Sequence, residues 1–228
     1  MLDEIISYRE MCDAENTQTL QRGMNFRMHP QYSIILMSRR SNAPYKDKIL
    51  EDGVSIEYQG HDAPKASFEI NPKELDQPEY TKNGSLTQNG LFIEAIKKYK
   101  EGRLPELVKV YEKILSGVWS LKGFFDLVDY RIENDGKRNV FIFVLKLSEN
   151  QNLGEVTLID IKHTRLIPSD VKKEVWKRDK GVCVICGSNK NLHFDHDLPF
   201  SKGGTSLTAK NIRLLCAKCN LAKSNKIE

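Results

Sequence analysis

The sequence has no run of about 18 consecutive apolar residues, which is the length that a membrane-spanning helix needs. Its first residues, MLDEIISYREM, include early acidic side chains and lack the basic start and apolar stretch of a secretory signal. No internal repeat or low-complexity segment is present. These absences predict a cytoplasmic protein without a membrane partner, and a hydrophobic fraction of 39% excludes disorder throughout the chain.

Cysteine is scarce in the first three quarters of the chain, where only Cys12 occurs among the five cysteines of the sequence. The other four lie in residues 161–228, which also hold 14 lysines and arginines against 6 acidic residues. Residues 1–160 have the opposite balance, with 21 basic and 25 acidic residues. A basic terminal third on a mildly acidic body predicts that one part of the chain meets a polyanion. A lysine-rich solvated surface is the alternative.

Several apolar or alternating runs in the first 150 residues predict strands: 32–38, 54–60, 124–133 and 139–147. Between the last two runs, Asp135-Gly136 predicts a hairpin turn. Helical spacing predicts two helices. One spans 88–100, with Leu91, Ala95 and Ile96 on its apolar side, and the other starts at Pro105 and runs to 115.

The segment after residue 150 predicts a change of domain. Residues 148–167 are polar, then β-like over 155–161, then extended. A third helix follows, with Ser169 as candidate N-cap, an apolar stripe that includes Val171, Val175 and Trp176, and Gly181 at its end. The predicted domains are residues 1–150, a linker over 151–164 and a second domain over 165–228.

Two C-x-x-C pairs, Cys183 with Cys186 and Cys216 with Cys219, are separated by 29 residues. In a reducing compartment these thiols do not predict disulfides. Each C-x-x-C turn directs two thiolates to one point, and two such turns complete a tetrahedron around Zn²⁺. We therefore predict a structural zinc site, because so short a domain has little core of its own. A metal-free thiol cluster is the alternative.

The segment between the two pairs carries side chains suited to hydrolysis. Asp195 and His196 are adjacent, so on an extended strand their side chains point to opposite sides and one can bind a metal while the other faces a water. If residues 217–225 form a helix, Asn220 and Lys223 lie on one face of it. Lys202, Gly203 and Gly204 predict a flexible loop.

Together these residues resemble the HNH endonuclease family, whose fold is the ββα-metal motif. The resemblance covers about residues 165–228 and includes the VWKRDKGVC segment before the first cysteine pair. The matching positions are Cys183-x-x-Cys186-Gly187, Asp195-His196, Pro199, Ser201 to Gly204, Asn211 and Cys216-x-x-Cys219-Asn220-x-x-Lys223.

The resemblance implies a role for each of these residues in phosphodiester hydrolysis. His196 is the expected general base, and Asn211 is expected to fix the backbone around it. Asp195 is the expected ligand of a catalytic Mg²⁺ or Mn²⁺, since carboxylate and amide oxygens suit hard cations. Asn220 stands where many members carry His, and its carbonyl is expected to ligate the same ion. Lys223 is predicted to contact phosphate, with a solvated lysine as the alternative.

Residues 20–148 resemble the SRA (SET and RING associated) domain, which binds modified cytosine. The resemblance lies in the order of several short patterns. They are a strand like YSIIL at 32–36, a strand ending Tyr-x-Gly at 58–60, Leu-Thr at 86–87 before a helix, and Gly-Phe-Phe-x-Leu-Val-Asp-Tyr at 123–130 followed by a turn and an apolar strand.

Such domains flip the modified base out of the duplex and stack it between aromatic rings, while a carboxylate reads its edge. The resemblance implies Tyr45 and Tyr58 as the rings and Asp47 as the acceptor of the cytosine amino group. Gln59 stands where a small hydroxyl residue is usual, Tyr45 and Asp47 are closer together than is usual, and the glycine pair after Tyr58 is missing. These departures leave the modified base open: it is 5-methylcytosine or 5-hydroxymethylcytosine. The tyrosines are otherwise ordinary loop and strand-end aromatics. Nearby basic residues predicted to bind phosphates, or else to form a solvated loop, are Arg39, Arg40, Lys46 and Lys48.

The sequence thus predicts an α+β protein that joins an SRA-like β-barrel-type domain with flanking helices to a ββα-metal domain stapled by a four-cysteine zinc site. The predicted activity is that of a prokaryotic modification-dependent restriction endonuclease acting on double-stranded DNA with modified cytosine. One HNH site attacks one phosphodiester, so double-strand cleavage requires a homodimer, which we expect, or two sequential nicks. The alternatives are an HNH nuclease that reads phosphorothioate DNA or plain sequence, and a non-catalytic zinc module that binds nucleic acid.

Overall fold

Most of the chain folds as strands in a computed structural model that describes residues 3–39, 43, 45–64, 71–151, 166–198 and 203–223. The strands are β1 (Glu4–Ser7), β2 (Met24–His29), β3 (Tyr32–Met37), β4 (Lys48–Ile49), β5 (Ser55–Gln59), β6 (Glu106–Leu115), β7 (Val118–Asn134), β8 (Asn139–Leu147), β9 (Leu192–His196) and β10 (Ile212–Cys216). The α-helices are α1 (Tyr8–Ala14), α2 (Gln88–Lys100), α3 (Ser169–Arg178) and α4 (Ala217–Lys223). Short 3₁₀ turns occupy Pro72–Glu74 and Ala209–Asn211. The α+β fold class is confirmed.

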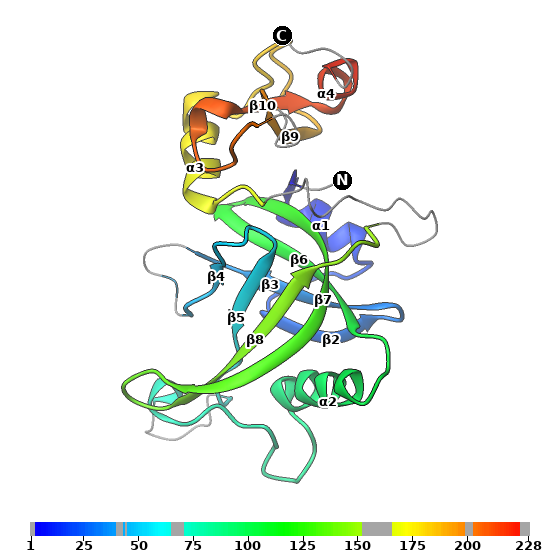
Figure 1. The fold of residues 1–228 in the computed structure, drawn as a ribbon, viewed down its shortest axis with the longest axis vertical. Coiled ribbons are helices and arrows are strands. Elements are labelled where there is room, and N and C mark those ends of the chain that lie inside the picture. The colour runs from blue at the N-terminus through cyan, green and yellow to red at the C-terminus, as the bar shows by residue number, and fades with distance from the viewer. Residues whose placement is uncertain are drawn as a thin grey trace.

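One sheet of ten strands runs through both predicted domains, in the order β10-β9-β1-β7-β6-β3-β2, with β8, β5 and β4 joined through β7. The strand that organises this sheet is β7, which pairs with β1 and β6 along its first part and with β8 along its second. Register shifts near Val110 and between Leu127 and Asp129 interrupt these ladders. Such irregularities bend and twist a strand, and Figure 1 shows β7 curving across the whole N-terminal part.

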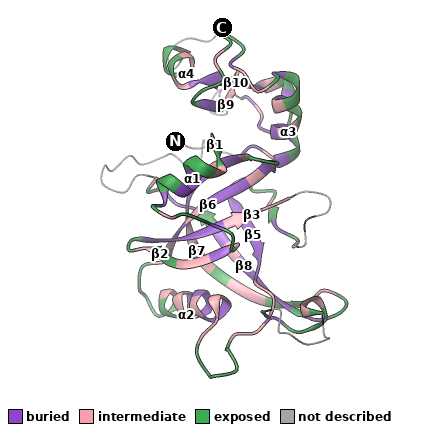
Figure 2. Cartoon of the chain, turned by 180° about the vertical axis from the view of Figure 1, so that it is seen from behind, coloured by how far each residue is buried: buried purple, intermediate pink, exposed green. Residues whose placement is uncertain are grey.

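The main core lies inside this curved sheet and is closed on one side by α2. Phe92, Ile93 and Ile96 of α2 are fully buried among aromatic and branched side chains of β3, β5, β6 and β8. Figure 2 shows many residues of β3, β5 and β6 as buried, whereas α2 contains buried, intermediate and exposed residues. The buried side of α2 is therefore centred on Phe92 and Ile93, with the predicted Leu91 and Ala95 only half-buried at its edge.

The predicted strands and hairpin are confirmed. The runs at 32–38, 54–60, 124–133 and 139–147 coincide with β3, β5, β7 and β8. The hairpin joins β7 to β8 with Asn134 opposite Asn139, and Gly136 in its turn has a φ of 97°. That left-handed conformation favours glycine, so the Asp-Gly signal marked the turn correctly.

The predicted helix from Pro105 to residue 115 is wrong, because Glu106–Leu115 forms β6. Burial alternates along its first half, with Val108 and Val110 buried and Leu107 and Lys109 half-buried between them. A period of two and β-branched side chains suit a pleated strand between two partners. These partners, β3 and β7, lie far away in the sequence, and the helical spacing of Leu107, Tyr111 and Leu115 was coincidental.

The N-terminus of α2 is built by the Leu-Thr-Gln-Asn-Gly segment at 86–90. Thr87 is the N-cap, and its hydroxyl accepts a hydrogen bond from the N–H of Gly90. Asn89 is fully buried, and its side-chain amide pairs with both backbone groups of His61, just after β5. The segment therefore fixes the end of β5 against the start of α2.

The expected N-cap of α3 is also wrong. The N-cap position is Pro168, no side chain caps the helix, and the Ser169 hydroxyl instead donates to Glu112 of β6. Gly181 lies beyond the helix end as predicted, with a φ of 66° and its N–H bonded to Trp176 O at 3.2 Å. The β-like segment predicted at 155–161 lies outside the described residues.

The C-terminal elements have their own core, but a residue from the start of the chain completes it. Ile5 of β1 packs against two apolar clusters made by α3, β9, β10 and the cysteine region. Conversely, Leu166, which precedes α3, packs in the core of the N-terminal part. Along the described ranges, no helix is long and apolar enough to cross a membrane.

A glycine-to-alanine change in α2 tests the packing at its start. Alanine normally stabilises a helix relative to glycine by about 0.5–1 kcal/mol. A Cβ on Gly90, however, would overlap the backbone oxygen of Glu79 and lie 2.7 Å from Leu86 Cδ2. We expect Gly90→Ala to lower the free energy of unfolding by about 1–3 kcal/mol in urea titrations. The control Lys98→Ala, on the exposed side of α2, should stay within about 0.5 kcal/mol, and a stabilised Gly90→Ala protein would contradict the packing.

Candidate nuclease centre and aromatic cavity

The strands β9 and β10 form an antiparallel hairpin that is followed directly by α4, which is a ββα arrangement. His196 pairs with Ile212 and Asp195 with Arg213 in this hairpin. Asp195 and His196 are neighbours at the end of β9, so their side chains leave the strand on opposite sides. His193, two residues before Asp195, is almost fully buried.

The ring of His196 is held by Ser206, whose Oγ lies 2.8 Å from Nε2. Ser206 is itself buried, 3% exposed. Burial lowers the pKa of His196, while the nearby carboxylates of Asp3 and Asp195 oppose that shift. A histidine with a lowered pKa is neutral at physiological pH and can accept a proton. The hydrogen bond at Nε2 leaves Nδ1 as the nitrogen for that proton.

Asn211 ties the loop after β9 to the start of β10. Its Oδ1 accepts from Leu198 N–H at 2.8 Å, and its Nδ2 donates to the carbonyls of Leu198 and Thr205 at 2.9 and 3.0 Å. Gly204 fits against this tie so closely that a Cβ would overlap the carbonyl of Leu198 and lie 2.9 Å from Asn211 Nδ2. The described part of the predicted flexible loop is therefore closely packed at Gly204, whereas Pro199, Ser201 and Lys202 lie outside the described residues.

Asp195 is paired with Lys223 of α4. The ammonium of Lys223 donates to Asp195 Oδ2 and to the backbone oxygen of His196, and its side chain is only 9% exposed. Asn220 lies one turn earlier on α4, on the same face. Oxygen donors of this kind fit a hard divalent cation, and an ion at Asp195 would share or take over the carboxylate that Lys223 now neutralises.

The four cysteines of the two C-x-x-C pairs come together, with ligand atoms within 4.8 Å of one another. Cys186 Sγ and Cys216 Sγ are 3.6 Å apart, close to the ~3.8 Å between sulfurs of a tetrahedral site with Zn–S bonds of about 2.3 Å. Burial by itself raises the pKa of Cys183, but N–H groups of the two knuckles outweigh it and lower that pKa to about 6. The donor set and spacing fit a structural zinc ion.

Tyr45 and Tyr58 line the same cavity, which has a volume of about 530 Å³. Its other walls come from the end of β3, the β6–β7 turn and α1, and include Trp119, Lys113 and Tyr8. Tyr45 is half-buried, whereas Tyr58 is only 2% exposed and belongs to the main core. Tyr45 thus presents its ring to the cavity, and Tyr58 forms part of its inner wall.

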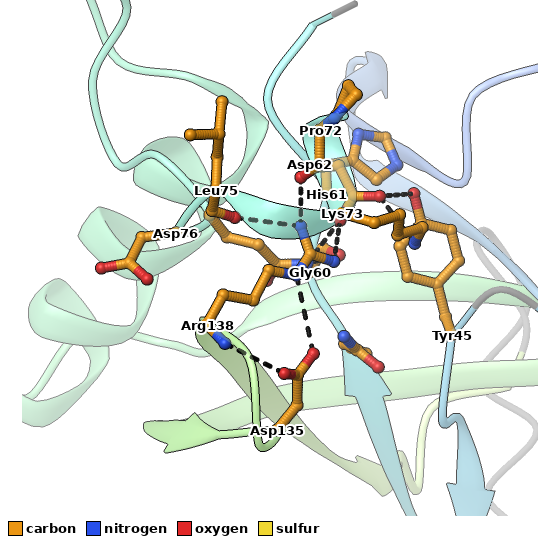
Figure 3. Close-up of polar contacts among 12 residues, drawn as sticks. Tyr45, Gly60, His61, Asp62, Pro72, Lys73, Leu75, Asp76, Asp135 and Arg138 are labelled. Carbon is orange, nitrogen blue, oxygen red and sulfur yellow. Dashed lines mark hydrogen bonds and ion pairs between the residues drawn. The ribbon is translucent and has the colours of Figure 1, made fainter. Parts of the chain in front are cut away.

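A cluster of charged groups holds the ring of Tyr45 in place (Figure 3). Its hydroxyl donates to Asp62 Oδ2 at 3.2 Å, and Lys73 Nζ lies 3.8 Å from the ring centroid. Asp62 also binds Arg138, which anchors the backbone oxygens of Pro72 and Leu75. Burial and the negative charge of Asp62 raise the pKa of Tyr45 to about 12, so the hydroxyl keeps its proton and the ring stays neutral.

Asp47, two residues after Tyr45, is buried, and both of its carboxylate oxygens accept hydrogen bonds. They accept hydrogen bonds from Ser38 N–H at 3.1 Å and Gln59 N–H at 3.2 Å. Burial raises the pKa of Asp47 to about 7, against the effect of these two N–H groups. Of the four predicted pocket residues, the structure brings Tyr45 and Tyr58 to the larger cavity, while Gln59 lines a smaller one of about 260 Å³.

The residues predicted to bind phosphate lie in different surroundings. Arg39 donates to Ser169 Oγ at 3.3 Å, and Lys48 pairs with Glu57 at 2.7 Å. Lys46 is exposed, Lys223 is paired with Asp195, and Arg40 lies outside the described residues. Lys46 therefore keeps the accessibility that the prediction requires, whereas Arg39, Lys48 and Lys223 bind other groups of the protein.

Several residues of these sites were missed in the sequence. Ser206 holds His196, and Trp119 and Lys113 line the cavity with Tyr45. A serine between two nearby threonines and a tryptophan in a strand carry no local signal for such roles. The sequence predicts Gly204 only as part of a flexible loop, although glycine is also the residue that permits a close approach of the backbone.

Residues 183–226 match the family model described as HNH endonuclease. This match covers the cysteine pairs, Asp195, His196, Asn211 and Asn220, and confirms the prediction of a DNA endonuclease domain at the C-terminal end of the chain. No curated relative matches the sequence.

The solved structures that resemble the chain include the SRA domain of SUVH5 in complex with hemi-methylated CG DNA, at 17% identity, with 70% of this chain and 92% of that chain covered and a TM-score of 0.44. They also include the SUVH5 SRA domain bound to fully hydroxymethylated CG DNA, at 16% identity, with 70% of this chain and 93% of that chain covered and a TM-score of 0.43. A third is Arabidopsis thaliana SUVH6 in complex with SAM, at 20% identity, with 79% of this chain and 30% of that chain covered and a TM-score of 0.42.

The cluster of four cysteines predicts that the protein binds zinc and that loss of a single cysteine, Cys216, removes the metal. We expect the purified protein to contain zinc bound by the four clustered thiols and Cys216→Ser to lose it, together with the cooperative thermal unfolding of the C-terminal domain. Atomic absorption and calorimetry would measure both. The control is Cys12→Ser, because Cys12 is buried in a different cluster; zinc loss in that variant, or retention in Cys216→Ser, would contradict the assignment.

The contacts of Asn211 predict a role in positioning the nuclease loop. Asn211→Ala removes three hydrogen bonds to the loop after β9, and changes of supporting residues around a catalytic site typically cost about 10–100-fold in activity. We expect the cleavage rate on DNA to fall within that range while zinc content and the unfolding temperature of the N-terminal core are kept. Cleavage at the wild-type rate would show that the loop needs no such tie.

Proposed function

We propose that the protein is a modification-dependent DNA endonuclease that flips 5-methylcytosine or 5-hydroxymethylcytosine out of a duplex and hydrolyses a nearby phosphodiester. The observation that carries this proposal is the meeting of Tyr45 and Tyr58, from a loop and a strand, at one cavity of about 530 Å³ in a chain that ends in a nuclease domain. Cavities of about 300–1,000 Å³ are typical of sites for small organic groups.

The nuclease half has a base and a support for it. His196 takes the proton of the attacking water at Nδ1, while Ser206 keeps the ring oriented through Nε2. Asn211 holds the loop that closes the site. Asp195, with the carbonyl of Asn220, would supply oxygen ligands for Mg²⁺ or Mn²⁺. A bound divalent ion stabilises the negative charge that develops on the phosphate during hydrolysis.

The recognition half offers one anchored ring. Lys73 covers one face of Tyr45, so the other face is the one on which a flipped base would stack. The anchoring through Asp62 and Arg138 fixes the ring before binding, which reduces the entropy lost on complex formation. Tyr58 and Trp119 complete apolar walls, on which a methyl or hydroxymethyl group of the base can rest. Asp47 does not line the cavity, and its two oxygens already accept from Ser38 and Gln59. Each oxygen keeps a second lone pair, and we assign to Asp47 the cytosine amino group.

Cleavage of both strands follows from the presence of one nuclease site in each chain. Two chains acting together, or one chain acting twice, can cut a duplex, and we propose the homodimer. Tethering of the nuclease to a domain that binds the modified base raises its local concentration at the marked site. Unmodified DNA lacks this gain, so we expect it to be cleaved more slowly.

The test compares three duplexes of one sequence that carry cytosine, 5-methylcytosine or 5-hydroxymethylcytosine. Binding is measured at fixed salt with His196→Ala, which should bind but not cut, and digestion is measured with the wild type in Mg²⁺ or Mn²⁺. We expect both modified duplexes to be bound and cut in preference to the unmodified one. Equal affinity for all three would refute recognition of the modified base, and cleavage by His196→Ala would remove the assignment of the general base.

The cavity is tested by removing the anchored ring. Stacking of one base on an aromatic side chain is worth about 1–3 kcal/mol, so Tyr45→Ala should weaken binding of the modified duplex by about 5–150-fold and leave that of the unmodified duplex unchanged. The matched control is Tyr80→Ala, since Tyr80 is 55% exposed and lies outside the cavity. An equal loss for modified and unmodified DNA would place Tyr45 in general DNA contact instead.

A further inference from the structure

Four buried charged side chains lie where the N-terminal sheet meets α3. Lys122, Glu112 and Lys172 have no exposed surface, and Asp3 is 6% exposed. Glu112 and Lys122 lie on the paired strands β6 and β7, Asp3 precedes β1, and Lys172 comes from α3 of the C-terminal part. The HNH mechanism uses none of them.

The contacts in this cluster cross from one part of the chain to the other. Lys172 Nζ donates to Asp3 Oδ1 and, at 2.8 Å, to Ser120 Oγ of β7, and lies 3.9 Å from Glu112 Oε2. Lys122 Nζ lies 2.9 Å from Glu112 Oε2. The Ser169 hydroxyl, also on α3, donates to Glu112 Oε1.

The charges balance only when the two parts are docked. The N-terminal part contributes two carboxylates and one ammonium, which leaves one negative charge, and Lys172 supplies the missing positive charge. Burial opposes ionisation of Asp3 and Glu112, but the two lysines outweigh it, and the pKa of each carboxyl stays below its usual value. Because an unpaired buried charge is strongly unfavourable, rotation of α3 that removes Lys172 from Asp3 and Glu112 is penalised.

Asp3 connects three elements at once. Its N–H donates to Leu121 O of β7 at 2.8 Å, its carboxylate binds Lys172 of α3, and its carbonyl accepts from Phe194 N of β9 at 3.4 Å. Its φ of 59° is a left-handed conformation that non-glycine residues adopt at a cost and that persists where surrounding contacts enforce it. Phe194 is two residues before His196, so the junction reaches the strand that carries the general base.

The same junction is close to the aromatic cavity. In the pairing of β1 with β7, Ile6 lies opposite Trp119, which lines the cavity, while the neighbouring Ile5 packs in the core of the nuclease domain. Arg39, at the start of the loop that carries Tyr45, donates to Ser169 of α3 at 3.3 Å. Short and direct contacts therefore join the wall of the cavity to the nuclease domain.

We propose that Lys172, through Asp3 and Glu112, is a positioning residue that locks the nuclease domain on the recognition domain in one orientation and so sets the distance between the modified base and the cut. Only the part of this inference that concerns DNA cleavage rests on the proposed function. The lock itself is a property of the free protein, and His196 acts at a defined phosphodiester because the strand that carries it is held through Asp3.

The test replaces Lys172 by methionine, which keeps the length of the side chain and removes its charge. In hydrogen exchange of the free protein, we expect Lys172→Met to lose protection in residues 3–7 and 192–196, while α2 and β3 keep theirs. On DNA with one modified cytosine, cutting at the wild-type position should fall by about 100-fold, since small misplacements of reacting groups have effects of that size. The remaining cuts should spread over neighbouring phosphodiesters. Lys173→Met, an adjacent lysine that pairs with Asp170 on the surface of α3, is the control and should match the wild type in both readouts.

Each outcome decides a different point. Unchanged exchange in Lys172→Met overturns the lock whatever the DNA result, and changed exchange with unaltered cut positions overturns its control of the cut distance. If the wild type does not distinguish modified from unmodified DNA, the proposed function is refuted. Hydrogen exchange of the free protein then remains as the test of whether Lys172 fixes the orientation of the two domains. If Lys172→Met loses its zinc and is unfolded, Ser169→Ala replaces it. That variant keeps every charge and should give smaller changes of the same kind, and wild-type behaviour in it overturns the proposal.

Discussion

The architecture depends on the burial of Lys172 against Asp3 and Glu112. Buried ion pairs add little net stability compared with apolar contacts of the same size, because desolvation of the charges offsets their attraction. Their contribution here is to fix the orientation of one part of the chain relative to the other. Ile5 of β1 provides apolar adhesion between the two parts, and apolar contacts tolerate sliding and rotation. A charge that has partners in only one arrangement does not, so the ion cluster selects one docking geometry among those that adhesion alone would allow.

The nuclease domain depends on the rest of the chain in a second way. Among its described residues, this domain contributes only β9 and β10 to the ten-stranded sheet, and an isolated two-stranded hairpin is marginal in water. Two features compensate for the small number of strands. The four thiols cluster next to β10, and β1 pairs with β9 and places Ile5 against the core of the domain. The conformation of Asp195 and His196 thus depends on the cluster of four cysteines on one side and on β1 on the other.

The sequence was informative wherever a property is set by neighbouring residues. The Asp-Gly turn and the apolar or alternating strands are local patterns, and their predictions are confirmed. The two C-x-x-C pairs are also local patterns, and their four thiols come together as predicted. The strand β6 was mistaken for a helix because its partners, β3 and β7, are distant and only they determine that residues alternate between buried and half-buried. Ser169 looks like an N-cap next to Pro168, but a buried carboxylate on β6 competes for its hydroxyl. Asp3 and Lys172 are 169 positions apart, and no local pattern can pair them.

The acidic balance of the N-terminal part gains a structural explanation from the same kind of pairing. Many of its carboxylates are neutralised inside the protein: Glu106 by Arg27, Glu15 by Lys109, Asp62 by Arg138 and Lys73, and Glu112 by Lys122. Charges held in such pairs create little field at the surface, whereas the exposed Lys46 beside Tyr45 remains available to a phosphate. A count of charges along the sequence therefore overstates how strongly this domain would repel DNA. What decides whether a duplex can approach is the small set of groups around the cavity, which lies next to the junction that fixes the nuclease.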